Sequence, residues 1–112
     1  MRAERAKFSQ TQKNYKPHLL VDKMLNLSEI NKEMETIDGW SLEENSLVKI
    51  FTFANFKESL DFFNKVGEIA EKHYHHPEAM ISYNIVRLSL STHSEHGLTK
   101  KDFEVARDID KL

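Results

Sequence analysis

The sequence predicts an α+β fold: a four-stranded antiparallel sheet with helices packed on one face, in the element order α-β-β-α-β-β-α. Three observations predict this order. Apolar residues recur at helical spacing behind capping residues, residues 40–53 alternate as strands do, and the alternation between residues 80 and 92 changes phase. A chain of 112 residues suits a single domain.

The first helix is expected to begin near Ser28, whose hydroxyl can cap it. Ile30, Met34 and Ile37 follow at spacings of four and three, which places them on one helical face. Gly39 is placed to end this helix in a left-handed turn.

A hairpin is expected next. Residues 40–44 alternate like a half-buried strand, Glu44-Asn45 forms a plausible turn, and Ser46–Phe53 forms the second strand. The second strand has apolar side chains on both faces, with Leu47, Phe51 and Phe53 on one and Val48 and Ile50 on the other. This pattern indicates a central strand, or a sheet covered on its second side by a partner subunit.

The longest helix is expected to start at Asn55, which with Glu58 resembles a capping box. Its apolar stripe follows spacings of four and three and comprises Phe56, Leu60, Phe63, Gly67 and Ala70. The helix must end before Pro77, because the residue that precedes a proline avoids helical angles.

The segment from Met80 to Thr92 is expected to form two short antiparallel strands, because one flat strand would not change phase. A turn near Tyr83-Asn84 would explain the change. The final helix begins at Thr99, where Asp102 completes a capping box. Leu98 and Phe103 occupy the positions of a hydrophobic staple, and the buried face comprises Phe103, Ala106 and Ile109.

The charge distribution predicts a flexible basic arm over residues 1–24 and one packed domain over residues 25–112. The arm has a net charge of +4, and the rest of the chain has −6. The near-neutral total argues against direct nucleic-acid binding. The lack of cysteine excludes disulfides and thiolate metal sites, and no apolar run is long enough to span a membrane.

Five of the six histidines lie between residues 73 and 96: His73, His75, His76, His93 and His96. A chain reversal near Asn84 would bring His93 close to His75 and His76, because His75 and His93 are equally distant from it in sequence. Three interpretations stay open: a metal site, a solvated polar loop, and acid–base chemistry in a pocket. The absence of cysteine and of HExxH spacing weakens the first.

The residues around these histidines resemble the pterin-4a-carbinolamine dehydratase family. The matching positions are Glu71-Lys-His-Tyr-His75-His76-Pro77, Tyr83, Ser91-Thr92-His93, Gly97-Leu98-Thr99 and Asp102. The resemblance runs from about Leu27 to Leu112 and includes Gly39-Trp40. It departs at Tyr74, where relatives often have aspartate or asparagine, at Ala79, where they often have tryptophan, and at Ser94, where they often have an acidic residue.

The resemblance implies a hydro-lyase that dehydrates 4a-hydroxytetrahydrobiopterin to quinonoid dihydrobiopterin by histidine acid–base catalysis, in tetrahydrobiopterin recycling. It implies three catalytic histidines, His75, His76 and His93. His75 would be the main acid at the hydroxyl, His93 would share proton transfer from the opposite side, and His76 would orient the ring. The implied substrate-binding residues are Glu71, Tyr74, Ser91, Thr92 and Ser94. Neither metal nor organic cofactor is implied, because the pterin is itself the substrate.

Two of these positions have structural alternatives, since Glu71 can be a solvated last-turn residue and Asp102 a helix cap alone.

A homodimer or homotetramer is expected, because an open sheet leaves edges to cover. Some relatives also bind a homeodomain transcription factor, so an alternative function is a protein-interaction module acting as its dimerisation cofactor. A molybdopterin- or folate-linked pterin activity is a third. The expected compartment is the cytoplasm, with the nucleus as a second.

Overall fold

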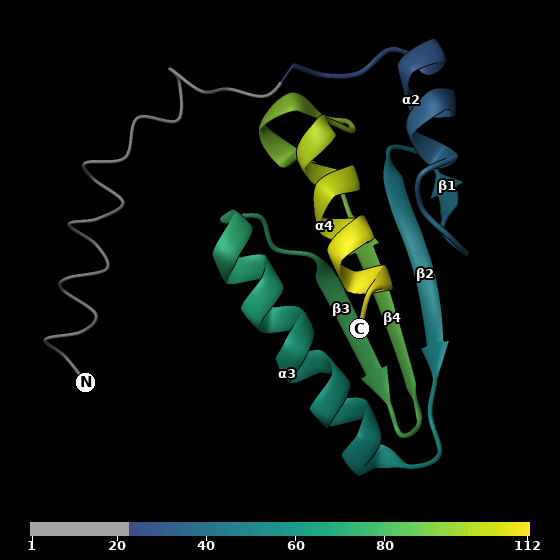
Figure 1. The fold of residues 1–112 in the computed structure, drawn as a ribbon, viewed down its shortest axis with the longest axis vertical. Helices are drawn as coiled ribbons and strands as arrows, with labels where there is room; N and C mark the ends of the chain where they lie inside the picture. The colour runs from purple at the N-terminus through teal and green to yellow at the C-terminus, as the bar shows by residue number, and fades with distance from the viewer. Residues whose placement is uncertain (1–22) are drawn as a thin grey trace, which may run out of the picture.

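The computed structural model describes residues 23–112, and the sequence-predicted order of helices and strands is confirmed (Figure 1). The bounds are α2 (Leu27–Met34), β1 (Ser41–Glu43), β2 (Ser46–Thr52), α3 (Phe56–His73), β3 (Glu78–Ser82), β4 (Ile85–Leu90) and α4 (Lys100–Asp110). A short 3-10 helix, η2 (His93–Glu95), was not anticipated and follows β4. The arm predicted over residues 1–24 falls almost wholly outside the described residues.

The four strands form one antiparallel sheet in the order β1-β2-β4-β3, so β2 is a central strand, as its two apolar faces indicated. The predicted reversal at Tyr83-Asn84 is confirmed, because Ser82 pairs with Ile85 and Glu78 pairs with Ser89. Leu47 near the start of β2 pairs with Leu90 at the end of β4. The end of β4 therefore lies between the first residues of β2 and those of β3.

Both long helices, α3 and α4, cover the same face of this sheet (Figure 1). The core between these layers comprises Trp40, Leu47, Val66, Val86, Leu88, Leu90, Leu98, Phe103, Val105, Ala106 and Ile109, with Leu25 beside them. On the opposite face, Ile50, Met80 and Ile85 are exposed. This distribution confirms that helices pack on one side of the sheet.

Helix α2 begins two residues earlier than expected, and Ser28 is not its cap. Asn26 is the cap: its Oδ1 accepts from the Glu29 N–H at 2.8 Å, and Glu29 Oε1 accepts from the Asn26 N–H at 2.9 Å. This reciprocal pair satisfies two N–H groups that a serine at position 28 could not reach. The helix also ends at Met34, so Gly39 (φ +80°) serves the following turn and not the helix end.

Helix α3 starts at Asn55 and ends before Pro77 as expected, but the predicted buried stripe is partly wrong. The buried residues are Ser59, Val66 and Ala70, whereas Phe56 and Leu60 are 46% and 40% exposed. The helix carries two neighbouring apolar stripes, and the sheet covers the one that begins at Ser59. Phe56 and Leu60 thus form an apolar surface that is not buried within residues 23–112.

A polar network joins β2 to the last turn of α4. Lys49 Nζ lies 2.9 Å from Asp110 Oδ1, and the indole N–H of Trp40 donates to the same oxygen at 2.9 Å. Asp110 Oδ2 accepts from the Asp38 N–H at 2.9 Å. The Lys49 ammonium also donates to the Asp38 carbonyl and lies 4.9 Å from the centre of the Phe51 ring. These contacts hold together three segments that are distant in sequence.

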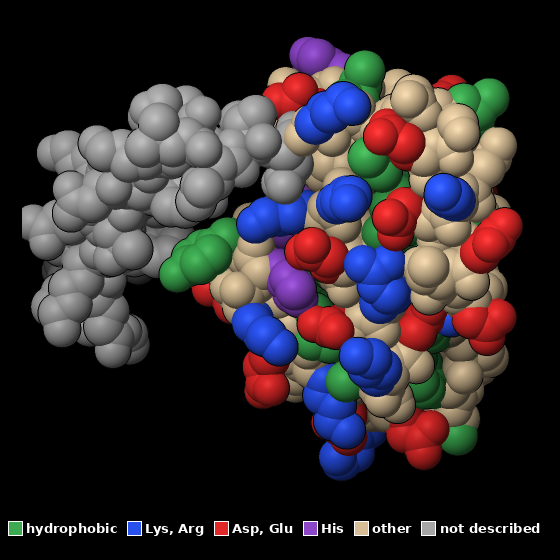
Figure 2. Space-filling view, turned by 45° about the horizontal axis from the view of Figure 1, so that its top comes forward, with side chains coloured by type: hydrophobic (Ala, Val, Ile, Leu, Met, Phe, Trp, Pro, Cys, Tyr) green, Lys and Arg blue, Asp and Glu red, His purple; other side chains and the backbone are tan. Residues whose placement is uncertain are grey.

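The surface seen in Figure 2 has Lys and Arg side chains interspersed with Asp and Glu. No single sign of charge dominates this face. No helix among residues 23–112 is both long and apolar enough to cross a bilayer.

Candidate active site

The candidate site lies at the end of the sheet where β4 finishes and β3 begins. The segment His75–Pro77 leads from α3 into β3, and η2 follows two residues after β4. Thr92 and Gly97 form an isolated bridge that closes the loop around η2. The β3–β4 hairpin therefore brings His75, His76 and His93 to one end of the molecule, as the sequence predicted.

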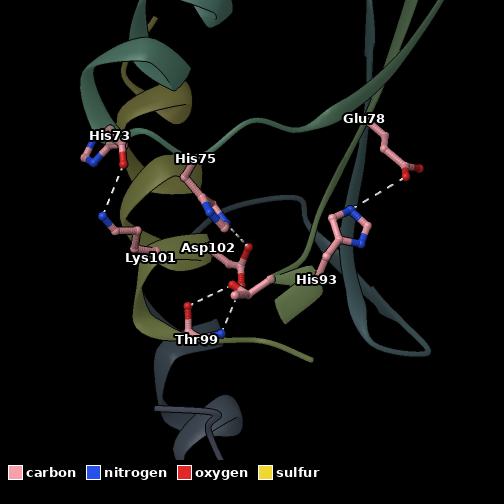
Figure 3. Close-up of polar contacts among 8 residues, drawn as sticks. His73, His75, Glu78, His93, Thr99, Lys101 and Asp102 are labelled. Carbon is pink, nitrogen blue, oxygen red and sulfur yellow. Dashed lines mark hydrogen bonds and ion pairs between the residues drawn. The ribbon is translucent and has the colours of Figure 1, made fainter. Parts of the chain in front are cut away.

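His75 is held by a carboxylate from α4 (Figure 3). Its Nε2 lies 2.5 Å from Asp102 Oδ1, and its side chain is 12% exposed whereas that of Asp102 is fully buried. A carboxylate accepts hydrogen bonds only, so Nε2 carries the proton that points at Asp102. The other ring nitrogen, Nδ1, takes no part in this hydrogen bond.

Asp102 is more than the helix cap that the sequence indicated. Its Oδ2 accepts from the Thr99 N–H at 2.9 Å, as a capping box requires, and from Thr92 Oγ1 at 2.8 Å. The two threonine hydroxyls are themselves 2.9 Å apart. The capping position thus also links α4 to the end of β4 and to His75. The sequence offered one indication of this second role, since Asp102 belongs to the matched family motif.

His76 pairs with a second carboxylate, that of Glu71. Its Nε2 lies 2.6 Å from Glu71 Oε2, and both side chains are more than half exposed. Glu71, which the resemblance implies as a substrate-binding residue, therefore contacts the His76 imidazole.

His93 is open to solvent. Its Nε2 lies 3.9 Å from Glu78 Oε2, and its side chain is 79% exposed. Figure 3 shows His93 and His75 on two sides of the Asp102 carboxylate, with His93 directed toward Glu78. Glu78 was not anticipated in the sequence; the only indication was that it follows Pro77 at the start of a strand.

The remaining predicted site residues fall on the surrounding loops. Tyr74 is the left-handed cap of α3 (φ 52°, ψ 40°) and is exposed, and Ser94 is an exposed residue of η2. Ser91 and Thr92 line a cavity of about 180 Å³ together with His93. Its other lining residues are Asn45, Ser46, His96 and Gly97, to which the resemblance assigned no catalytic or binding role.

His73 belongs to a separate pair on the helical layer. Its Nε2 lies 2.7 Å from Asp108 Oδ2, and its carbonyl oxygen accepts from Lys101 Nζ at 3.2 Å. The hydrogen bond from His73 is the main cause that holds the pKa of Asp108 below its ordinary value, and burial opposes it. Within residues 23–112, no three or more His, Asp and Glu side chains gather as metal ligands would.

The fold and site define an α+β domain in which histidine–carboxylate pairs gather at one end of an antiparallel sheet. A sequence profile of the family described as "Pterin 4 alpha carbinolamine dehydratase" matches residues 23–112. The chain belongs to this pterin-4a-carbinolamine dehydratase family.

Individual relatives agree with this assignment. A Sulfolobus acidocaldarius protein named "Putative pterin-4-alpha-carbinolamine dehydratase" is 49% identical over 88 residues, covering 79% of this chain and 97% of that protein. A Nostoc punctiforme protein of the same name is 40% identical over 89 residues, covering 80% and 96%. The crystal structure of a "transcriptional coactivator/pterin dehydratase from Brucella Melitensis" has a TM-score of 0.76 and 34% identity, covering 80% of this chain and 97% of that chain.

Proposed function

We propose that the protein dehydrates 4a-hydroxytetrahydropterins, with 4a-hydroxytetrahydrobiopterin as the substrate, and that its histidines transfer the protons. The reaction protonates the hydroxyl at C4a, which leaves as water, and removes the proton from N5. The product is the quinonoid dihydropterin, so atoms and charge balance without a further reactant. The observation that carries the proposal is His75 bonded to the buried Asp102 in a chain of this family.

His75 would act as the main acid through Nδ1. Its Nε2 is bonded to Asp102, so Nδ1 is the ring nitrogen that can carry a proton to the leaving hydroxyl. Fixing the ring in one orientation reduces the entropy lost when the substrate arrives. Asp102 is then a positioning residue, since it acts through His75 and does not touch the pterin.

His93 would remove the N5 proton from the opposite side, and His76 would orient the ring. The His93 side chain is 79% exposed, so a proton that its ring accepts from the substrate can pass on to water. Glu71 would hold His76 in place. Ser91, Thr92, Ser94 and Tyr74 would contribute contacts to the ring from the surrounding loops.

The proposal is tested by measuring turnover of chemically generated carbinolamine above its spontaneous dehydration. His75→Ala and His93→Ala are each expected to lower kcat by about 100-fold or more, as loss of a general acid or base does. His73→Gln is the matched control, because it removes an imidazole paired with Asp108 outside the site. It should leave kcat within about twofold of the wild type.

Equal rates for the wild type and the His75→Ala, His93→Ala double variant would refute the proposed dehydratase activity. The interaction module would then be the better account, in line with the coactivator name of the Brucella relative. Binding of a homeodomain transcription factor's dimerisation segment, with both histidines absent, would be the direct measurement.

A further inference from the structure

Helix α4 contacts the chain at the end of α3 through two neighbouring side chains of its first turn, and the proposed mechanism uses only one of them. Asp102 bonds to the His75 ring. The preceding residue, Lys101, donates from its ammonium group to the carbonyl oxygen of His73 at 3.2 Å (Figure 3). Adjacent residues of one helix thus hold positions 73 and 75 of the chain, with Tyr74 alone between them.

The charge of Lys101 is unfavourable for its own helix. Lys100 and Lys101 are the first two residues of α4, where the partial positive charge of a helix N-terminus disfavours cations. The carbonyl end of α3 carries the opposite partial charge, and the carbonyl of its last residue, His73, has no acceptor role inside the helix. The half-buried Lys101 therefore gains its electrostatic stabilisation at the end of α3, whereas Lys100 is exposed.

The carbonyl group that Lys101 binds is followed by the turn that directs His75 toward Asp102. Tyr74 is left-handed in this turn (φ 52°), a conformation that is unfavourable for a residue with a Cβ atom. The N–H groups of Tyr74 and His75 both donate to the Ala70 carbonyl. A residue in such a conformation persists when the surrounding structure fixes it. Lys101 provides a contact before Tyr74, and Asp102 provides one after it.

We propose that Lys101 is a positioning residue for His75: it fixes the carbonyl end of α3 and, through the turn at Tyr74, the direction of the His75 ring. Without Lys101, the ring depends on Asp102 alone for its orientation. Lys101 acts through a backbone oxygen, so a substitution of the His73 side chain leaves the acceptor in place. The expected effect on kcat rests on the proposed function, whereas the effect on the His75 ring does not.

The test compares Lys101→Met with Lys100→Met, the matched control that removes the same charge from the same turn. Lys101→Met should lower kcat about tenfold and change KM less than about twofold, because misplacing a catalytic group by about 1 Å can cost up to about 100-fold in rate. Lys101→Arg can donate to the same carbonyl and should restore kcat to within about twofold of the wild type. Lys100→Met should leave kcat and KM as in the wild type.

Hydrogen exchange of the His75 Nε2–H proton, followed by NMR, reports the position of the ring without catalysis. The bond to Asp102 protects this proton, and the amides of β4 report global unfolding on the same sample. In Lys101→Met the His75 proton should exchange about tenfold faster relative to the β4 amides, the effect of losing one hydrogen bond from a charged group. A residue that only stabilises the fold would accelerate both equally.

Wild-type kcat in Lys101→Met, or a His75 proton that accelerates no more than the β4 amides, would overturn the positioning role while the dehydratase stands. Failure of Lys101→Arg to restore the rate would overturn it as well. A wild type that turns over no carbinolamine would refute the proposed function instead, and the exchange measurement then decides alone whether Lys101 positions His75. Should Lys101→Met not fold, Lys101→Gln, which also lacks the charge, replaces it under the same criteria.

Discussion

Replacing Asp102 by asparagine separates the two roles of this residue, because the side chain keeps its shape and loses its charge. The Thr99 N–H and the Thr92 hydroxyl both donate to Oδ2. The amide oxygen of the variant must occupy that position, since an NH₂ group there would face two donors. The NH₂ group then points at His75 Nε2, which has to become an acceptor. His75 is forced into the tautomer whose proton is on Nδ1.

The expected effects are a small loss of stability and a large loss of activity. The three hydrogen bonds to the Asp102 side chain are kept but lose the charge of the acceptor, which lowers the free energy of unfolding by about 1–2 kcal/mol. Asp102→Ala also removes the cap and leaves buried donors unsatisfied, at about 3 kcal/mol. In the asparagine variant the neutral His75 ring already carries its proton on Nδ1. This is the nitrogen that must gain and lose a proton in the proposed mechanism, so kcat should fall by about 100-fold or more.

Three measurements on one preparation check this. Urea unfolding gives the change in stability, carbinolamine turnover gives kcat and KM, and nitrogen chemical shifts of His75 report the tautomer. Asp108→Asn is the matched control, because it weakens the other histidine–aspartate pair of α4 outside the site. It should cost similar stability and leave kcat and the His75 spectrum unchanged.

Asp102 does not position His75 for catalysis if Asp102→Asn, folded and with unchanged KM, loses no more kcat than Asp108→Asn. Asp102 does not fix the His75 tautomer if the His75 nitrogen shifts of this variant are those of the wild type.

Three further outcomes are expected. The lowered pKa of Asp108 contributes stability that is complete above its ordinary value of 3.8 and is lost as the pH falls through the lowered value. His73→Phe should therefore flatten the acid limb of a stability–pH curve, and an unchanged limb contradicts this. Tyr74→Gly removes a side chain from a left-handed cap and should raise the free energy of unfolding by about 0.5–1 kcal/mol in urea; a decrease contradicts it. Leu60→Glu should dissociate a homo-oligomer in light scattering, since Phe56 and Leu60 are apolar and exposed; a monomeric wild type contradicts it.

The order of helices and strands and the location of the site could be predicted, because residues close together in the sequence determine both. The phase change around Tyr83-Asn84 identified the hairpin, and that hairpin alone brings His93 to the end of the sheet occupied by His75. Thr99 and Phe103 marked the last helix with a cap and a staple, both of which depend on residues within one turn.

The sequence predictions were wrong or incomplete where tertiary packing determines which residues are buried or in contact. The sequence of α3 alone does not show whether the stripe with Phe56 or the stripe with Ser59 is buried, because the position of the sheet determines this. The capping role explained Asp102 completely, so the hydrogen bond between its Oδ1 and His75 was not anticipated. Asn45 reaches the site from a turn 30 residues before His75, a contact that depends on the β2–β4 register.

The single tryptophan gives the protein an intrinsic fluorophore at a useful place. Trp40 is buried, and its indole N–H is bonded to Asp110 in the final turn of the chain. Its emission should shift to longer wavelength when α4 separates from the rest of the domain. A fluorimeter can therefore follow folding of every variant discussed above without a label.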